Sequence, residues 1–314
     1  MTAIKRTHNR EINILRAMLI VLVILVHIAN FGQLYPEVKA RVLAFLMPAF
    51  LLITGYLTNV DKRLLDFGRY VGQIALPYVI LVTGFALLSL YFPVRDGLEV
   101  FSWEALVRIV LIDAIGPYWF LHTMLVCSTL YYVVYWLFAP LGLVGRYTLL
   151  GVTLALVARF TPLLGIETAC YYYMGIGVHC FWKDFSRLYV HSLWPLLPFG
   201  LLMIDGTLLG ADSIGVLISV VCFFSFATQI GAWFKGRVAK VVDYVGRNTF
   251  PIYIFHPIFT LAAKYLLPLF AHDTTGLMHT FTTIIMSLVG CLAMAALLDR
   301  TRLCYLFGRA ALLR

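Results

Sequence analysis

Two ionisable side chains in the first long apolar run, Arg16 and His27, are the residues best suited to chemistry in this sequence. They lie eleven residues apart, which in an α-helix is three turns plus about 20°, so both face the same side. An ionisable group inside an apolar run of bilayer length must face a cavity or a partner rather than lipid. The pair therefore predicts a helix face with a cation near one membrane surface and a titratable base about 16 Å deeper.

Each of these residues also has an ordinary structural interpretation. Arg16, near the end of a span, could extend its guanidinium to anionic lipid headgroups. His27 could be a neutral imidazole bonded to a neighbouring helix, and Asn30, on the same face, is a candidate partner that would orient it. An imidazole with an ordinary pKa of ~6.5 also suits general-base catalysis, and this is the hypothesis we carry forward for His27.

Further candidates lie at the starts of later apolar runs. Arg69 and Gln73 are four residues apart and share a helix face that could hold a phosphate group, although loop cations also serve as simple membrane anchors. Trp119 follows Pro117 at the start of a span and is typical of an interfacial anchor. His122 could join the site of His27 or contact water, and we favour water.

A second intramembrane histidine, His256, is followed by Pro257. Because proline has no N–H, Pro257 deprives a backbone carbonyl of its helical partner, which a membrane tolerates only against protein or water. We expect Asn248 or Thr249 to cap this helix after Gly246 ends the preceding one.

The composition indicates a membrane protein. Hydrophobic residues make up 62% of the 314 residues and charged residues 12%, and the mean hydropathy is +0.91. The net charge of +9 comes mainly from Lys and Arg at the ends of apolar runs, so we expect no nucleic-acid partner. The six cysteines lie mostly inside apolar runs without metal-like spacing, so they predict buried hydrophobes and no metal site.

Apolar runs alternate with short charged loops along the whole chain, which predicts an all-α integral membrane protein with a bundle of about ten transmembrane helices. The expected spans are 12–31, 41–60, 70–92, 117–139, 146–164, 167–182, 190–210, 213–234, 248–271 and 276–298. Between the third and fourth, the stretch 92–117 predicts an amphipathic helix at the interface. The expected organisation is a cytoplasmic tail 1–11, a membrane domain 12–299 and a cytoplasmic tail 300–314.

The distribution of basic residues predicts the topology. Eighteen of the 24 Lys and Arg residues fall in one alternating set of loops and six in the other. Because cytoplasmic loops carry the cationic excess, both termini are expected in the cytoplasm.

Four segments, in order, resemble the acyltransferase 3 family of integral membrane acyltransferases. They are Arg10-Glu11 with Leu15-Arg16 and then His27; the basic loop running into Pro77-Tyr78; the run Tyr118-Trp119-Phe120-Leu121; and the run from Gly246-Arg247-Asn248-Thr249 through Ile252-Tyr253 to His256-Pro257.

The resemblance implies transfer of an acyl group, usually acetyl, from cytosolic acyl-coenzyme A to a hydroxyl of a carbohydrate or lipid-linked glycan, in the inner membrane of a bacterial cell. It implies that Arg16 and His27 are essential, and it makes Glu11 a further candidate. Where many members have a second arginine before the third helix this chain has Gln73, which leaves Arg69 as the nearest guanidinium. The sequence contains no SGNH hydrolase-like domain, so we expect the standalone form.

The sequence therefore predicts a multi-pass O-acyltransferase that uses acetyl-CoA as donor substrate and holds no tightly bound cofactor. Arg16 and Arg69 would bind the phosphates of the donor, and His27 would act as a general base or form an acyl-histidine. The alternative is a proton-coupled transporter or glycan exporter, which would carry more acidic residues inside its spans. The sequence leaves open the acceptor sugar, the acyl length, the membrane face of the acceptor and the oligomeric state.

Overall fold

The computed structural model of the protein describes residues 10–92, 97–210 and 213–314, and these form helices without any strand. The all-α prediction is therefore confirmed for the described residues. The expected cytoplasmic tail 1–11 lies outside them except for Arg10 and Glu11, which already belong to the first helix.

The α-helices are α1 (Arg10–His27), α2 (Ala29–Leu34), α3 (Pro36–Leu57), α4 (Leu64–Ser89), α5 (Trp103–Arg108), α6 (Trp119–Leu137), α7 (Leu143–Phe160), α8 (Ile166–Gly177), α9 (Leu196–Asp205), α10 (Ile214–Trp233), α11 (Gly236–Arg247), α12 (Thr249–Ala262) and α13 (Leu277–Arg300). Two π-helical turns, η1 (Ile109–Asp113) and η3 (Val178–Trp182), extend α5 and α8. The 3-10 helices are η2 (Gly116–Tyr118), η4 (Phe185–Leu188), η5 (Thr207–Leu209), η6 (Ala263–Phe270) and η7 (Leu303–Phe307).

Seven helices among the described residues are long and apolar enough to cross a membrane, which makes the chain a multi-pass membrane protein. They are Pro36–Leu57, Leu64–Ser89, Gly116–Leu137, Leu143–Phe160, Ile214–Trp233, Thr249–Phe270 and Leu277–Arg300. Each corresponds to one of the ten expected spans.

The three other expected spans are shorter or more polar helices. The run 12–31 is divided between α1 and α2, and α1 carries three charged side chains, Arg10, Glu11 and Arg16. The run 167–182 is α8 extended by η3, and 190–210 contains only the ten-residue α9 and η5. The count of ten crossings and the cytoplasmic position of both termini therefore stay predictions.

The stretch between the third and fourth expected spans is helical, as its spacing predicts. Ser102 caps α5 by accepting a hydrogen bond from the backbone of Ala105 at 3.1 Å. Leu106 and Ile109 are buried while Glu104 and Arg108 are exposed, so this helix is amphipathic. Its place at a membrane interface stays a prediction.

The chain folds into two compact units. The first comprises Met1–Phe50, Ser186–Leu297 and Leu312–Arg314, and the second comprises Leu51–Phe185 and Leu298–Ala311. Each unit is described by itself below.

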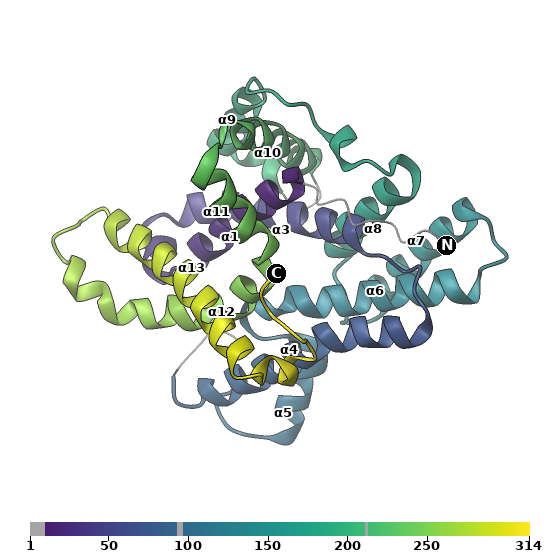
Figure 1. The fold of residues 1–314 in the computed structure, drawn as a ribbon, viewed down its shortest axis with the longest axis horizontal. Coiled ribbons are helices and arrows are strands. Elements are labelled where there is room, and N and C mark those ends of the chain that lie inside the picture. Colours follow the sequence, from purple (N-terminus) through teal and green to yellow (C-terminus); the bar gives the residue numbers. More distant parts are fainter. Residues whose placement is uncertain (1–9, 93–96, 211–212) are drawn as a thin grey trace. The chain divides into compact units, whose positions relative to one another are not determined.

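In the first unit α1 packs against α10, α11 and α12 (Figure 1). Its Leu15, Leu19 and Ile24 are fully buried, which explains how a helix with three charges can lie inside an apolar protein. A Cβ at Gly246 would overlap the carbonyl oxygen of Asn13, so this glycine permits backbone contact between α11 and α1. Because α12 begins directly after α11, the packing of α11 on α1 also keeps the start of α12 close to α1.

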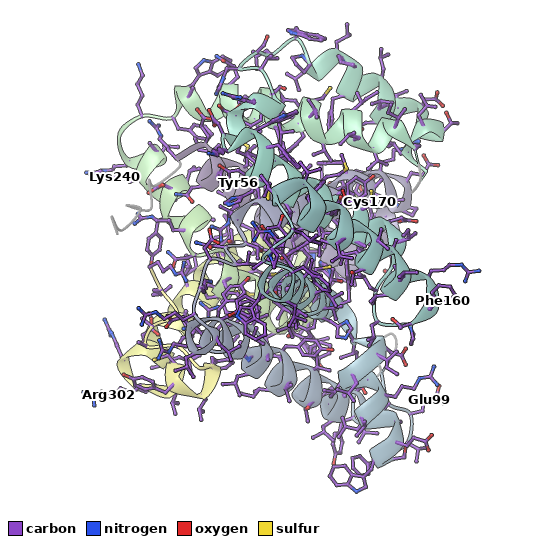
Figure 2. All side chains as sticks on the ribbon, turned by 90° about the vertical axis from the view of Figure 1, so that its right-hand side faces the viewer. Tyr56, Glu99, Phe160, Cys170, Lys240 and Arg302 are labelled. Carbon is purple, nitrogen blue, oxygen red and sulfur yellow. The ribbon has the colours of Figure 1, made fainter. Side chains whose placement is uncertain are left out.

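In the second unit α6 packs against α4, α7 and α8. A Cβ at Gly55 would overlap the carbonyl of Tyr172, so α3 and α8 also meet backbone to backbone. Exposed side chains on these helices are largely apolar, as lipid contact requires; Phe160, at the end of α7, is 75% exposed (Figure 2). Charged groups such as Glu99 and Arg302 extend outward from short helices or loops (Figure 2).

Candidate functional site

Arg16 is bound at the amino-terminal end of α12. Its Nη2 donates a hydrogen bond to the hydroxyl of Thr249, the first residue of that helix. Only about a third or less of the Arg16 residue is exposed, so its guanidinium is held by protein rather than extended to headgroups. The structure thus favours the binding-site interpretation of Arg16 over the lipid anchor.

Asn248, the residue before Thr249, binds the backbone of Arg314. Asn248 is fully buried, and its side-chain amide donates to the carbonyl of Tyr244 at 2.8 Å and to the main-chain oxygen of Arg314 at 3.2 Å. Its Oδ1 accepts from the backbone N–H of Arg314 at 2.7 Å. Asn248 occupies the N-cap position of α12, as expected, but its side chain makes no capping hydrogen bond. The amide is used for a long-range contact instead.

These bonds place a second cation near the first. Arg314 lies close enough to Arg16 for the two like charges to repel. Arg16 and Arg314 therefore lie near each other close to the amino terminus of α12.

His27 is the last residue of α1, eleven residues beyond Arg16 on the same continuous helix. Its Nδ1 lies 2.7 Å from the carbonyl of Val23, so Nδ1 carries the proton and donates to its own helix. The carbonyl of Val23 thus has the orienting role expected for Asn30, and that expectation is wrong. The described residues offer Nε2 of His27 no hydrogen-bond partner, so its lone pair is available as a base.

His256 has a parallel arrangement that Pro257 makes possible. Pro257 has no N–H to donate to the carbonyl of Tyr253, four residues earlier. The Nδ1 of His256 donates to that carbonyl at 2.7 Å, which answers the question raised by the proline in the sequence. The Nε2 of His256 is buried without a hydrogen-bond partner among the described residues.

The two histidines meet. Their ring centroids are 5.0 Å apart at an interplanar angle of 71°, an edge-to-face arrangement. His256 is fully buried, whereas His27 is partly exposed, so only His27 can meet a substrate directly. The geometry supports His27 as the reacting base and His256 as a residue that positions its ring.

Glu11 has a structural contact in the same unit. Its carboxylate accepts a hydrogen bond from the hydroxyl of Tyr189 at 2.7 Å and lies 3.1 Å from Nε2 of His191. Both partners belong to the segment before α9. Glu11 therefore fixes that segment against the start of α1.

The two phosphate-binding candidates lie on α4 in the second unit. Arg69 forms an exposed ion pair with Asp66 at 3.2 Å. Because exposed ion pairs contribute little free energy, a doubly charged phosphate could take the place of the Asp66 carboxylate at small cost. The backbone carbonyl of Gln73 accepts two hydrogen bonds from Arg309, at 3.2 Å from Nε and 3.0 Å from Nη2. A guanidinium therefore does lie beside Gln73, supplied by the chain beyond η7.

The fourth expected span contributes structural contacts in the second unit. His122 is 9% exposed, and its Nε2 lies 3.0 Å from the carbonyl of Leu111 in η1. It binds that carbonyl, and the expectation of water contact stays a prediction. Trp119 is half-buried at the start of α6, beside Phe120.

Sequence reasoning missed three features of these sites. It identified Thr249 only as a possible cap, counted Arg309 and Arg314 only as topology-setting cations, and did not foresee that His256 meets His27. No local pattern could reveal them, since the partners are more than 200 residues apart along the chain, as in the Arg16–Thr249 pair. Within the described residues no three His, Cys, Asp or Glu side chains converge as metal ligands would.

A family model described as an acyltransferase domain, the acyltransferase 3 domain, matches residues 9–296, nearly the whole chain. No curated protein and no solved structure matches it.

Proposed function

The chain belongs to the acyltransferase 3 family and is a membrane acyltransferase, and from that premise we propose that it is an O-acyltransferase of bacterial cell-surface glycans. The donor is acetyl-CoA or another acyl-CoA, and the acceptor is a sugar hydroxyl of a polysaccharide or of its lipid-linked precursor. The membrane is the bacterial inner membrane. The observation that carries the proposal is the open Nε2 of His27, on the same helix as the protein-held guanidinium of Arg16.

The proposed reaction uses His27 as a general base. Its Nε2 accepts the proton of the acceptor hydroxyl as the oxygen attacks the thioester carbonyl. The new C–O bond forms, the C–S bond breaks, and the imidazolium returns its proton to the departing CoA thiolate. The hydrogen bond from Nδ1 to Val23 supports this role, because it holds the tautomer whose lone pair lies on Nε2.

The donor would be held through its phosphates. Arg16, with the amino terminus of α12 at Thr249, offers positive charge in the first unit. Arg69 and Arg309, at α4 in the second unit, are an alternative pair of cations for the same task. Arginine suits this task since its planar fork matches phosphate oxygens. Acetyl-CoA is consumed as a substrate, and these steps need no tightly bound cofactor.

The test is transfer of radiolabel from acetyl-CoA to membrane glycan in vesicles that contain the wild type, His27→Ala or Arg16→Ala. We expect a loss of about 100-fold or more for His27→Ala, the range for removal of a general base. Protein level in the membrane is measured for each variant. Normal transfer by His27→Ala at a normal protein level would refute the catalytic role. Unchanged glycan acetylation in a deletion strain, with altered solute uptake, would instead favour a transporter.

A further inference from the structure

A cavity of about 230 Å³ lies in the first unit, directly after His27 in the chain. It is lined by Ile28, Ala29, Asn30, Gln33, Thr260, Lys264, Leu267 and His279. We call it the α2–η6 cavity, because its walls come from α2, the end of α12, η6 and the start of α13. At about 30 Å³ for a water molecule in the liquid, its volume equals roughly eight waters, enough for one small polar ring.

Most of the wall surface is apolar, with polar groups set into it. Five of the eight side chains carry hydrogen-bonding groups: the amides of Asn30 and Gln33, the hydroxyl of Thr260, the ammonium of Lys264 and the imidazole of His279. Amides both donate and accept, which suits a ligand with several hydroxyls.

His279 supplies an independent sign that the cavity takes a polar ligand. It is only 3% exposed, and its Nε2 bonds to the carbonyl of Ala263 at 3.0 Å. Its Nδ1 is buried and has no hydrogen-bond partner among the described residues. Because leaving a buried polar atom unpaired costs about 1–3 kcal/mol, a ligand hydroxyl at this wall would find a ready partner.

The cavity and Arg16 lie at opposite ends of α1. Arg16 is near the amino-terminal end, His27 is the last residue, and Ile28 begins the cavity wall. On the other wall Thr260 follows His256 by about one helical turn. Along this path the imidazole of His27 comes between the guanidinium and the cavity, as it should if donor and acceptor approach from opposite ends.

We propose that the α2–η6 cavity binds the acceptor, a single sugar ring whose oxygens contact Asn30, Gln33 and Lys264. This inference rests on the proposed acyl transfer and adds the acceptor's binding residues to it. Asn30 is then an acceptor-binding residue. Gly276, in the left-handed region at φ +64°, leaves room for its amide: a Cβ there would lie 2.7 Å from Nδ2 of Asn30.

The experiment blocks the cavity chemically in membrane vesicles. Gln33→Cys and Lys264→Cys are treated with a bulky maleimide, and the matched control is Leu269→Cys, which is 70% exposed on the same η6 helix but outside the lining. The treated wild type controls for reaction at native cysteines such as the exposed Cys170. Two quantities are measured: radiolabel passed from acetyl-CoA to the endogenous membrane glycan, and the rise in unfolding temperature that acetyl-CoA produces by binding.

We expect the maleimide to lower transfer at least tenfold in both cavity variants while the thermal shift by acetyl-CoA stays unchanged. The labelled Leu269→Cys and the treated wild type should keep their transfer. Full transfer by both labelled cavity variants would overturn the inference, and so would loss of the acetyl-CoA shift, which would make the cavity a donor site. A wild type that transfers no label at all would instead refute the proposed function, and the acceptor assignment with it.

Discussion

The imidazole rings of His27 and His256 lie edge to face with their centroids 5.0 Å apart, and each donates through Nδ1 to a carbonyl of its own helix. Both Nε2 atoms are therefore acceptors. Two imidazolium charges at this separation would repel strongly, so the pair takes up one proton at a time. In the proposed reaction, a proton accepted by His27 would then be held beside a neutral ring.

The hydrogen bond from His256 to Tyr253 predicts a difference between two substitutions. His256→Leu deletes the donor to the carbonyl that Pro257 cannot serve, at a cost of about 1–3 kcal/mol. His256→Asn places an amide N–H near the position of Nδ1 and should keep most of the stability. The apparent unfolding temperature of the purified protein measures both. Equal losses in the two variants would show that this bond does not stabilise α12.

The contact between Arg16 and Thr249 predicts an effect on donor binding. Thr249→Val keeps the shape of the side chain but deletes the hydroxyl that accepts from the guanidinium. A hydrogen bond to a charged group contributes about 1.5–3 kcal/mol, so the KM for acetyl-CoA should rise about tenfold or more while kcat changes less. Thr283→Val is the matched control, because that buried hydroxyl bonds only to the carbonyl of His279 in its own helix, at 2.8 Å. An unchanged KM for acetyl-CoA in Thr249→Val would show that the hydrogen bond from Arg16 to Thr249 does not contribute to donor binding.

The close approach of α11 to α1 predicts that Gly246 tolerates no side chain. In Gly246→Ala the new methyl would overlap the carbonyl of Asn13, a backbone atom that cannot move aside. We expect a loss of about 1–3 kcal/mol or more and a lower yield of folded protein. Gly84→Ala, on α4, meets nothing within 4 Å and should be close to neutral. Yield and elution as a single species on size-exclusion chromatography compare the two, and equal behaviour would contradict the tight packing.

The carboxylate of Asp273, in the turn before α13, predicts a pH-dependent contribution to stability. It accepts hydrogen bonds from the hydroxyl of Thr275 at 2.5 Å and from the backbone of Met278 at 2.7 Å, and these lower its pKa below the usual 3.8. A lowered native pKa stabilises the fold above the unfolded pKa, and that contribution is lost as the pH falls through the native value.

Asp273→Ala should therefore lower the unfolding temperature by a constant amount above about pH 5. Below pH 3.8 the gap between variant and wild type should close. Thr275→Val, which deletes the first of these donors, should show the same trend with a smaller gap. A gap that does not depend on pH would assign the effect to packing of the turn.

Properties that depend on short stretches of chain could be predicted from the sequence. Hydropathy is a sum over neighbouring residues, so the all-α, multi-pass character and seven of the spans were correctly predicted. The spacing of Arg16 and His27 needs only helix geometry, and both do lie on one continuous α1. Prediction was weakest where polar residues interrupt apolar runs, as between His27 and Asn30, where α1 ends and α2 begins.

The partners of those residues were decided by the tertiary structure alone. Whether Arg16 meets lipid or Thr249, and whether His27 has a second histidine beside it, depends on how α12 packs against α1 more than 200 residues away. A glycine at position 246 is compatible with close helix packing, but the sequence does not identify α1 as the helix that it contacts. The sequence by itself determined which side chains could react, because ionisable groups in apolar helices are costly and few. Packing decided which residues these side chains meet, whereas the Nδ1 hydrogen bonds of His27 and His256 stay within their own helices.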